Sequence, residues 1–195
     1  SNDMKKFTKY ILFISLGLLC SCSDYLDIVP DNVTTLDIVF NNKNTAQRYL
    51  ANCYHFVPDH GSVKRIPGMG AGHECWFYTD KDSYFDNEVS FYIARGLQNT
   101  NAPYANYWDG EGGSKLPMFR AIRECNIFLS YVRDQHKVND LTDSERKRWI
   151  AEVNVLKAYY HFFLFEHYGP IPIVDEALPV STSSEGVKVT RMPVD

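Results

Sequence analysis

The fold is decided by the stretch Glu152-Val-Asn-Val-Leu-Lys-Ala-Tyr-Tyr-His-Phe-Phe-Leu164, which lies within the longest helix that the sequence predicts. That helix opens with the capping box Thr142-Asp-Ser-Glu145 and runs to Tyr168, where Gly169 and two prolines end it. Its apolar stripe recurs at helical spacing and consists of Trp149, Val153, Leu156, Tyr160, Phe163 and His167. Because almost every side chain from Val155 to Phe165 is apolar, we expect other helices to surround this part.

Shorter helices precede this one. A helix after Pro117 presents the face Met118, Ile122, Cys125, Leu129 and Val132, and Asn126 lies beside that face. An earlier helix starts at Asn44, which stands three residues before Gln47, and carries the stripe Ala46, Tyr49, Leu50, Cys53, Tyr54 and Val57. Pro58 and Gly61 end it, and a short helical candidate covers residues 35–40. Such helices pair into hairpins, so the sequence predicts an all-α fold of tetratricopeptide-like helical hairpins.

The region from Asp59 to Lys115 shows no long periodic element and is rich in glycine. A long irregular stretch inside a domain often carries function, so we look for a ligand site here. Flat aromatic faces and nearby polar groups are what sugar rings require. We therefore hypothesise a glycan site in which Trp76 and Tyr78 form a stacking platform and Arg65 and Asp80 lie nearby.

The alternative is that the aromatic residues of this region only cover the helical layer. For Trp108, just before the helix after Pro117, and for Trp149, inside the longest helix, packing in the core is the favoured interpretation. Alanine substitution distinguishes the two interpretations, because only the residues of a stacking platform contribute to ligand affinity.

The composition allows one cored domain, since 45% of the 195 residues are hydrophobic and 14% are aromatic. The formal net charge is −4, and omitting residues 1–21 leaves 17 basic and 23 acidic residues, a net charge of −6. A nucleic-acid partner is not expected, because phosphate binding needs a basic face.

No metal or cofactor is expected either. The spacing of the five cysteines does not fit a zinc site, and Cys53, Cys75 and Cys125 are interpreted as buried free thiols. His161 and His167 are six residues apart, which does not suit chelation from one helix face, so they are interpreted as satisfied or exposed histidines.

The N-terminal region has the features of an export signal. Lys5, Lys6 and Lys9 precede an apolar run from Tyr10 to Leu19, too short for a spanning helix. The following Leu19-Cys-Ser-Cys22 resembles a bacterial lipobox in which Cys22 is the modified cysteine, and acyl chains there would anchor the protein to a membrane. An ordinary signal peptide with a chance pair of cysteines is the alternative.

We therefore predict three segments. Residues 1–21 form a lipoprotein signal peptide, residues 22–43 form a tether and turn-rich segment, and residues 44–195 form the N-terminal part of a helical domain. The chain stops after Val187 to Asp195 without a domain-ending signal, so we expect this domain to be a fragment of a larger one.

Several segments in the same order resemble the SusD/RagB family of Bacteroidetes outer-membrane lipoproteins. They are the lipobox at Cys22, Asp27 to Thr34, Arg123-Glu-Cys-Asn126, and the stretch Glu152 to Leu164 followed by Tyr168-Gly-Pro-Ile-Pro172. The resemblance implies a surface-exposed, lipid-anchored helical protein of the outer membrane that captures oligosaccharides or polysaccharides such as starch for a SusC-like TonB-dependent transporter. One departure is Lys157, where the family usually has an arginine.

Two alternatives to glycan capture remain. In the RagB branch of the same family the ligand is a peptide, and a lipid-anchored glycan hydrolase is a further candidate. A hydrolase is disfavoured because no Gly-x-Ser-x-Gly motif occurs and the sequence does not place two carboxylates as an acid and base pair. The glycine runs at Gly68 and Gly110 lack the spacing of nucleotide-binding loops. We predict a binding protein, not an enzyme.

Overall fold

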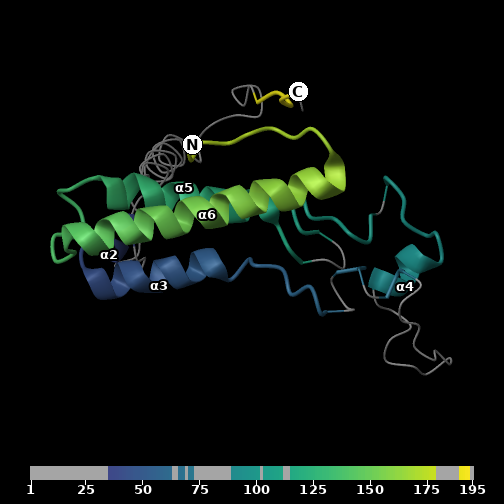
Figure 1. The fold of residues 1–195 in the computed structure, drawn as a ribbon, viewed down its shortest axis with the longest axis horizontal. Helices are drawn as coiled ribbons and strands as arrows, with labels where there is room; N and C mark the ends of the chain where they lie inside the picture. Colours follow the sequence, from purple (N-terminus) through teal and green to yellow (C-terminus); the bar gives the residue numbers. More distant parts are fainter. Residues whose placement is uncertain are drawn as a thin grey trace, which may run out of the picture. The chain divides into compact units, whose positions relative to one another are not determined.

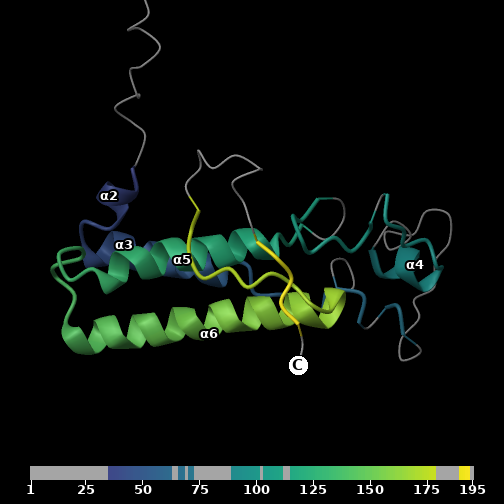
Figure 2. The same ribbon diagram turned by 90° about the horizontal axis from the view of Figure 1, so that it is seen from above.

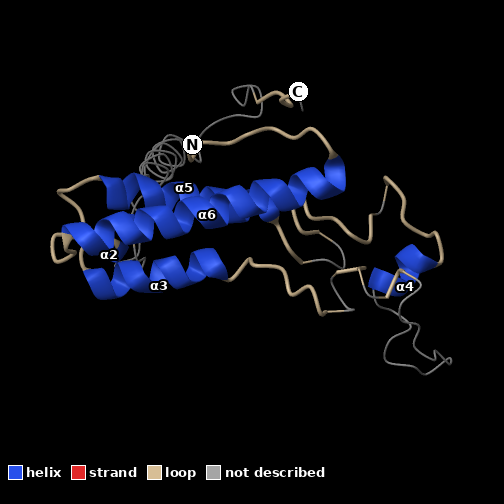
Figure 3. Cartoon of the chain, in the orientation of Figure 1, coloured by secondary structure: helices blue, strands red, loops and turns tan. Residues whose placement is uncertain are grey.

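The computed structural model describes residues 35–62, 66–68, 70–72, 89–101, 103–111, 115–178 and 189–193. All regular secondary structure within these ranges is helical (Figure 3). The helices are α2 (Leu36–Val39), α3 (Lys43–Tyr54), α4 (Val89–Ala94), α5 (Met118–Arg133) and α6 (Asp143–Tyr168). The all-α prediction is confirmed, and none of these helices is long and apolar enough to cross a membrane.

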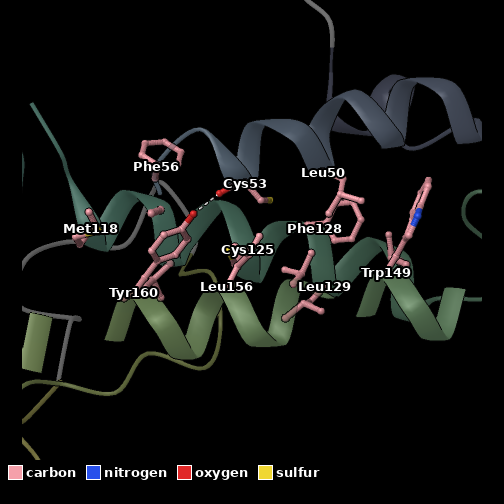
Figure 4. Packing of buried hydrophobic residues seen from close by; sticks show 14 of the residues in the cluster. Leu50, Cys53, Phe56, Met118, Cys125, Phe128, Leu129, Trp149, Leu156 and Tyr160 are labelled. Atoms are coloured by element: carbon pink, nitrogen blue, oxygen red, sulfur yellow. Dashed lines mark hydrogen bonds between the residues drawn. The ribbon is translucent and has the colours of Figure 1, made fainter. Parts of the chain in front are cut away.

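The centre of the fold is the antiparallel hairpin of α5 and α6, which make more contacts with each other than any other pair of helices (Figures 1 and 2). Helix α3 packs against both of them. The apolar faces of the three helices meet in one core, which contains Leu50, Cys53, Ile122, Cys125, Phe128, Leu129, Trp149, Val153, Leu156 and Tyr160 (Figure 4). The predicted helical hairpin and the predicted face of α5 are therefore confirmed.

Both ends of α6 lie where the sequence predicts them. The backbone N–H of Glu145 donates to the Thr142 hydroxyl over 3.3 Å, and the Glu145 carboxylate accepts from the Thr142 N–H over 3.1 Å, which completes the capping box. The Lys43 ammonium also pairs with Glu145 and ties α3 to this cap. The hydrogen bond from Lys43, followed by those from Thr142, lowers the pKa of Glu145 to about 2. Gly169, with φ of 68°, ends the helix in a conformation that suits glycine.

The predicted start and end of α3 are wrong by a few residues. The cap is Asn42, whose side-chain oxygen accepts from the Thr45 N–H over 3.1 Å, whereas Asn44 lies inside the first turn. Asn42 has extended backbone angles, which a cap needs and a helical residue lacks. The helix ends at Tyr54. Tyr54 and Val57 are each 41% exposed, so they do not extend the buried stripe.

The expectation that other helices surround the middle of α6 is also wrong for the described part of the chain. Val155 is 69% exposed, Phe162 54% and Phe165 38%, although the stripe from Trp149 to Phe163 is buried. Helices α3 and α5 contact α6 on this stripe, and the described residues place no helix on the opposite face. His167, at the end of the stripe, is exposed.

The two faces of α6 can be told apart by neighbouring substitutions. Leu156→Ala removes a core side chain and should lower the free energy of unfolding by about 2–5 kcal/mol. Val155→Ala removes an exposed one and should change it by less than about 0.5 kcal/mol. Urea unfolding followed by circular dichroism measures both, and equal losses would contradict this burial pattern.

Candidate functional site

The residues predicted to bind glycan, Arg65, Trp76, Tyr78 and Asp80, lie outside the described residues, as do Cys22 and Cys75. Their roles stay predictions. The structure does describe the next segment of the chain, namely α4 and the loop that leads from it to α5. This segment supplies the candidate site.

Helix α4 is fixed by buried side chains and by a hydrogen bond to Ile66. Val89, Ser90 and Phe91 are buried, and the Ser90 hydroxyl donates to the Ile66 carbonyl over 3.2 Å. The helix ends at Ala94, and Gly96 follows it with a φ of 72°, which is favourable for glycine. The N–H of Leu97 donates back to the Tyr92 carbonyl over 2.9 Å, which reverses the chain direction after α4.

The reversal brings together two aromatic rings that we call the tyrosine pair. Tyr92 and Tyr104 stack with ring centroids 4.2 Å apart and ring planes 13° from parallel, and both residues are half-buried. The Gln98 side-chain oxygen accepts from the N–H groups of Tyr104 and Ala105 over 2.8 and 3.3 Å, and so folds the loop back onto α4. The exposed Asn101 and Asp109 lie in the same loop. Aromatic faces beside amides and carboxylates suit a sugar ligand.

The far end of this loop is fixed to α6. Tyr107 is fully buried, and its ring meets Phe163 edge-on at 5.0 Å, while its N–H donates to the Tyr168 hydroxyl over 2.8 Å. Burial raises the pKa of both tyrosines, so each stays protonated at neutral pH. The end of the loop that leads to α5 is therefore held firmly against α6.

The two tryptophans interpreted as packing residues do pack. The Trp108 ring lies 4.6 Å from the Phe119 ring and 5.6 Å from the Tyr168 ring, and the Arg191 guanidinium lies 5.6 Å from its centroid. Trp149 is 3% exposed within the core. Trp108 is half-buried among these neighbours, which agrees with its interpretation as a packing residue.

On the other side of the hairpin, α5 and α6 hold residues 171–178, which we call the strap. The Asn126 side-chain N–H donates to the Val174 carbonyl over 3.0 Å, and His161 Nε2 accepts from the Val174 N–H over 3.2 Å. His161 Nδ1 donates to the Lys157 carbonyl over 2.8 Å, so both ring nitrogens are used, as expected for a satisfied histidine. The Arg123 guanidinium donates to the Leu178 carbonyl. The Arg123–Asn126 segment therefore serves to fix the strap.

The strap also borders an apolar hollow. Its volume is about 320 Å³, and it is lined by His161, Phe162, Phe165, Pro170, Ile171, Ile173, Met192 and Pro193. A second hollow of about 590 Å³ lies where α3 meets α6, lined by Gln47, Leu50, Arg148, Trp149, Ala151, Glu152 and Val155. Within the described ranges no three histidine, cysteine or carboxylate side chains gather to hold a metal ion.

A helical scaffold thus presents aromatic and amide groups from an irregular loop. Residues 24–195 match the model of the SusD-like family, described as starch-binding and associating with the outer membrane. The chain therefore belongs to the SusD-like family, whose members are generally non-catalytic binding proteins, and membership associates it with the outer membrane. A comparison with curated proteins found no match.

The tyrosine pair was missed by the sequence analysis. Its two rings are twelve residues apart and belong to a short helix and a loop, so no helical or strand period relates them. The only available signals were the glycine at position 96, which indicates a chain reversal, and the richness of this loop in asparagine.

The contact between His161 and the strap should depend on pH. Burial lowers the pKa of His161 below its usual 6.5, although the hydrogen bond to the Lys157 carbonyl opposes this effect. The Lys157 ammonium lowers the pKa further, and the Asp175 carboxylate raises it. The neutral ring accepts from Val174, so the contact is complete above pH 6.5 and is lost as the pH falls through the lowered pKa of the folded protein. Lowering the pH from 7.5 to 5 should reduce hydrogen-exchange protection of the Val174 amide by about 2- to 10-fold after correction for intrinsic rates.

His161→Gln keeps an acceptor that does not titrate, so it should remove this pH dependence. The matched control is His167→Gln, because the His167 ring hydrogen-bonds to the Phe163 carbonyl of its own helix and packs against Tyr107, and no described contact joins it to the strap. An unchanged pH profile in His161→Gln would contradict the role of this histidine.

Proposed function

We propose that the chain is a non-catalytic cell-surface lipoprotein that binds oligosaccharides or polysaccharides and delivers them to a SusC-like TonB-dependent transporter. The observation that carries the proposal is the family match over residues 24–195, because that family is described as starch-binding and associated with the outer membrane. A net charge of −4 also suits a neutral ligand better than a polyanion.

The ligand site that we propose is the irregular region between α3 and α5. Trp76 and Tyr78 supply stacking faces, Arg65 and Asp80 supply hydrogen bonds to sugar hydroxyls, and the tyrosine pair extends the aromatic surface. Chain connectivity supports this grouping, since residues 73–88 lead directly into Val89 at the start of α4.

The scaffold contributes rigidity to that site. The loop after α4 is tied to α6 through Tyr107, and α3 is tied to α6 through the Tyr160 hydroxyl, which donates to the Cys53 carbonyl over 2.5 Å. A binding loop with both of its ends fixed loses less conformational entropy when a ligand binds. Such preorganisation raises the affinity for a ligand.

The proposed platform can be tested by replacing Trp76 and Tyr78 with alanine, singly and together, in the full chain. Each single change should weaken the binding of a starch oligosaccharide by at least about tenfold, since losing a central aromatic contact typically costs about 2 kcal/mol. Isothermal titration calorimetry measures the affinity. Phe162→Ala is the matched control, because it removes a 54% exposed aromatic side chain of the α6 scaffold and should leave the affinity unchanged.

Other outcomes would contradict parts of the proposal. Wild-type affinity in the double variant would contradict the platform. Binding of peptides with no binding of glycans in a parallel screen would favour the RagB-like function. Release of shortened sugars during the titration would favour a hydrolase and overturn the non-catalytic proposal.

The proposed lipid anchor at Cys22 has its own test. Cys22→Ala should move most of the protein from the membrane fraction to the soluble fraction, because acyl chains contribute about 0.8 kcal/mol per buried methylene group. Cys20→Ala is the matched control and should leave fractionation unchanged, since it keeps the modified cysteine. Retention of Cys22→Ala in the membrane fraction would contradict the anchor.

A further inference from the structure

Two cysteines face each other in the core, one from α3 and one from α5. Cys53 and Cys125 are both free thiols with no exposed surface. Figure 4 shows them on the sides of α3 and α5 that face each other. Both side chains belong to the same buried cluster. The core therefore holds a pair of adjacent thiols from two helices.

We propose that Cys53 and Cys125 form a disulfide bond that joins α3 to α5 when the chain folds outside the cytoplasm. The compartment supports this step, because a protein associated with the outer membrane passes through the periplasm, where disulfides form and persist. The inference depends on this outer-membrane association and not on the identity of the ligand.

The helix faces allow the approach that the bond needs. A disulfide requires its two Cα atoms to lie within about 7 Å of each other. Ala46 and Ala121 lie on the same buried faces as the two cysteines, and their short side chains permit close packing of α3 on α5.

The oxidant is an oxidised dithiol, such as the active-site disulfide of a periplasmic thiol oxidoreductase. One cysteine thiolate attacks a sulfur of that disulfide and forms a mixed disulfide, which releases one donor thiolate. The second cysteine thiolate then attacks the protein sulfur of the mixed disulfide and displaces the other donor sulfur. The chain loses two protons and two electrons, and the donor is reduced to a dithiol.

The reaction must precede final packing of the core. Neither sulfur is accessible in the folded protein, and the hydrogen bond to Cys125 together with burial raises the pKa of Cys53, so little thiolate is present at neutral pH. The same burial shields the finished bond from reductants. The disulfide is therefore a structural crosslink made during folding and not a reversible switch.

The crosslink acts on the proposed ligand region. Cys53 stands near the end of α3 and Cys125 in the first half of α5, so the bond closes a loop that contains the tyrosine pair and the predicted platform. Closing a long loop restricts the unfolded chain more than the folded one and stabilises the fold. It also fixes the distance between the two ends of the irregular region.

Peptide mapping of the exported full chain tests the bond directly. The protein is extracted, alkylated under denaturing conditions without reductant, and digested with trypsin. Cleavage after Arg48, Lys64, Arg123 and Arg133 places the two cysteines on separate peptides, 49–64 and 124–133, and Cys75 on a third. The expected result is one crosslinked species of peptides 49–64 and 124–133, which separates into its parts on reduction.

Thermal unfolding provides a second measurement. Reduction during unfolding should lower the Tm of the exported wild-type chain by about 5–10 °C, and it should have no such effect on the Cys53→Ala, Cys125→Ala double variant. Cys75→Ala is the matched control and should keep the wild-type response. Alkylation of both Cys53 and Cys125 in the unreduced exported chain, or a crosslink to Cys75 instead, would overturn the proposal even if a variant fails to fold.

Discussion

Four backbone carbonyl groups converge on the guanidinium of Arg146, and the remainder of the fold depends on this contact. The side chain is only 8% exposed, and it donates to the carbonyls of Val132, Asp134, Lys137 and Val138 over 2.6–3.1 Å. A buried charge is costly unless hydrogen bonds satisfy it, and the carbonyls at the end of α5 carry the partial negative charge that suits a cation. The contact fixes how α6 returns along α5, and Val138, once placed, donates its N–H to the Phe40 carbonyl.

Once its direction is fixed, α6 supports α3 and the loop after α4. Its first turn binds Lys43 of α3, its middle supplies Tyr160 to the end of α3, and its last residue supplies Tyr168 to the loop after α4. The contacts of Tyr160 and Tyr168 lie near the two ends of the irregular region that separates α3 from α5. A stiff helix therefore sets the geometry of a segment that has little regular structure of its own, which is how binding loops are commonly positioned.

Local signals were enough to predict much of this fold. The capping box at Thr142, the buried faces of α5 and α6 and the end at Gly169 depend on neighbouring residues, so the sequence alone reveals them. The exposed face of α6 could not be predicted, because an apolar run does not show which side its partners occupy. Arg146 looks like any surface cation in the sequence, and its carbonyl partners are brought together only by the turn after α5. The tyrosine pair likewise depends on the chain reversal at Gly96.

Lys157 stands where the family resemblance led us to expect an arginine, and its contacts are ones that a lysine can make. Replacing arginine by lysine removes a planar group that can hold a carboxylate with two parallel hydrogen bonds. Here the Lys157 ammonium reaches the side-chain oxygen of Asp175 at 3.0 Å and the Asp175 carbonyl at 3.2 Å, and these two acceptors do not require a planar partner. This pairing lowers the pKa of Asp175, so the carboxylate stays charged and the strap stays attached at neutral pH. Asn126 and His161 hold the adjacent Val174 from both sides, so the Lys157 contact is one of three that attach the middle of the strap to α5 and α6.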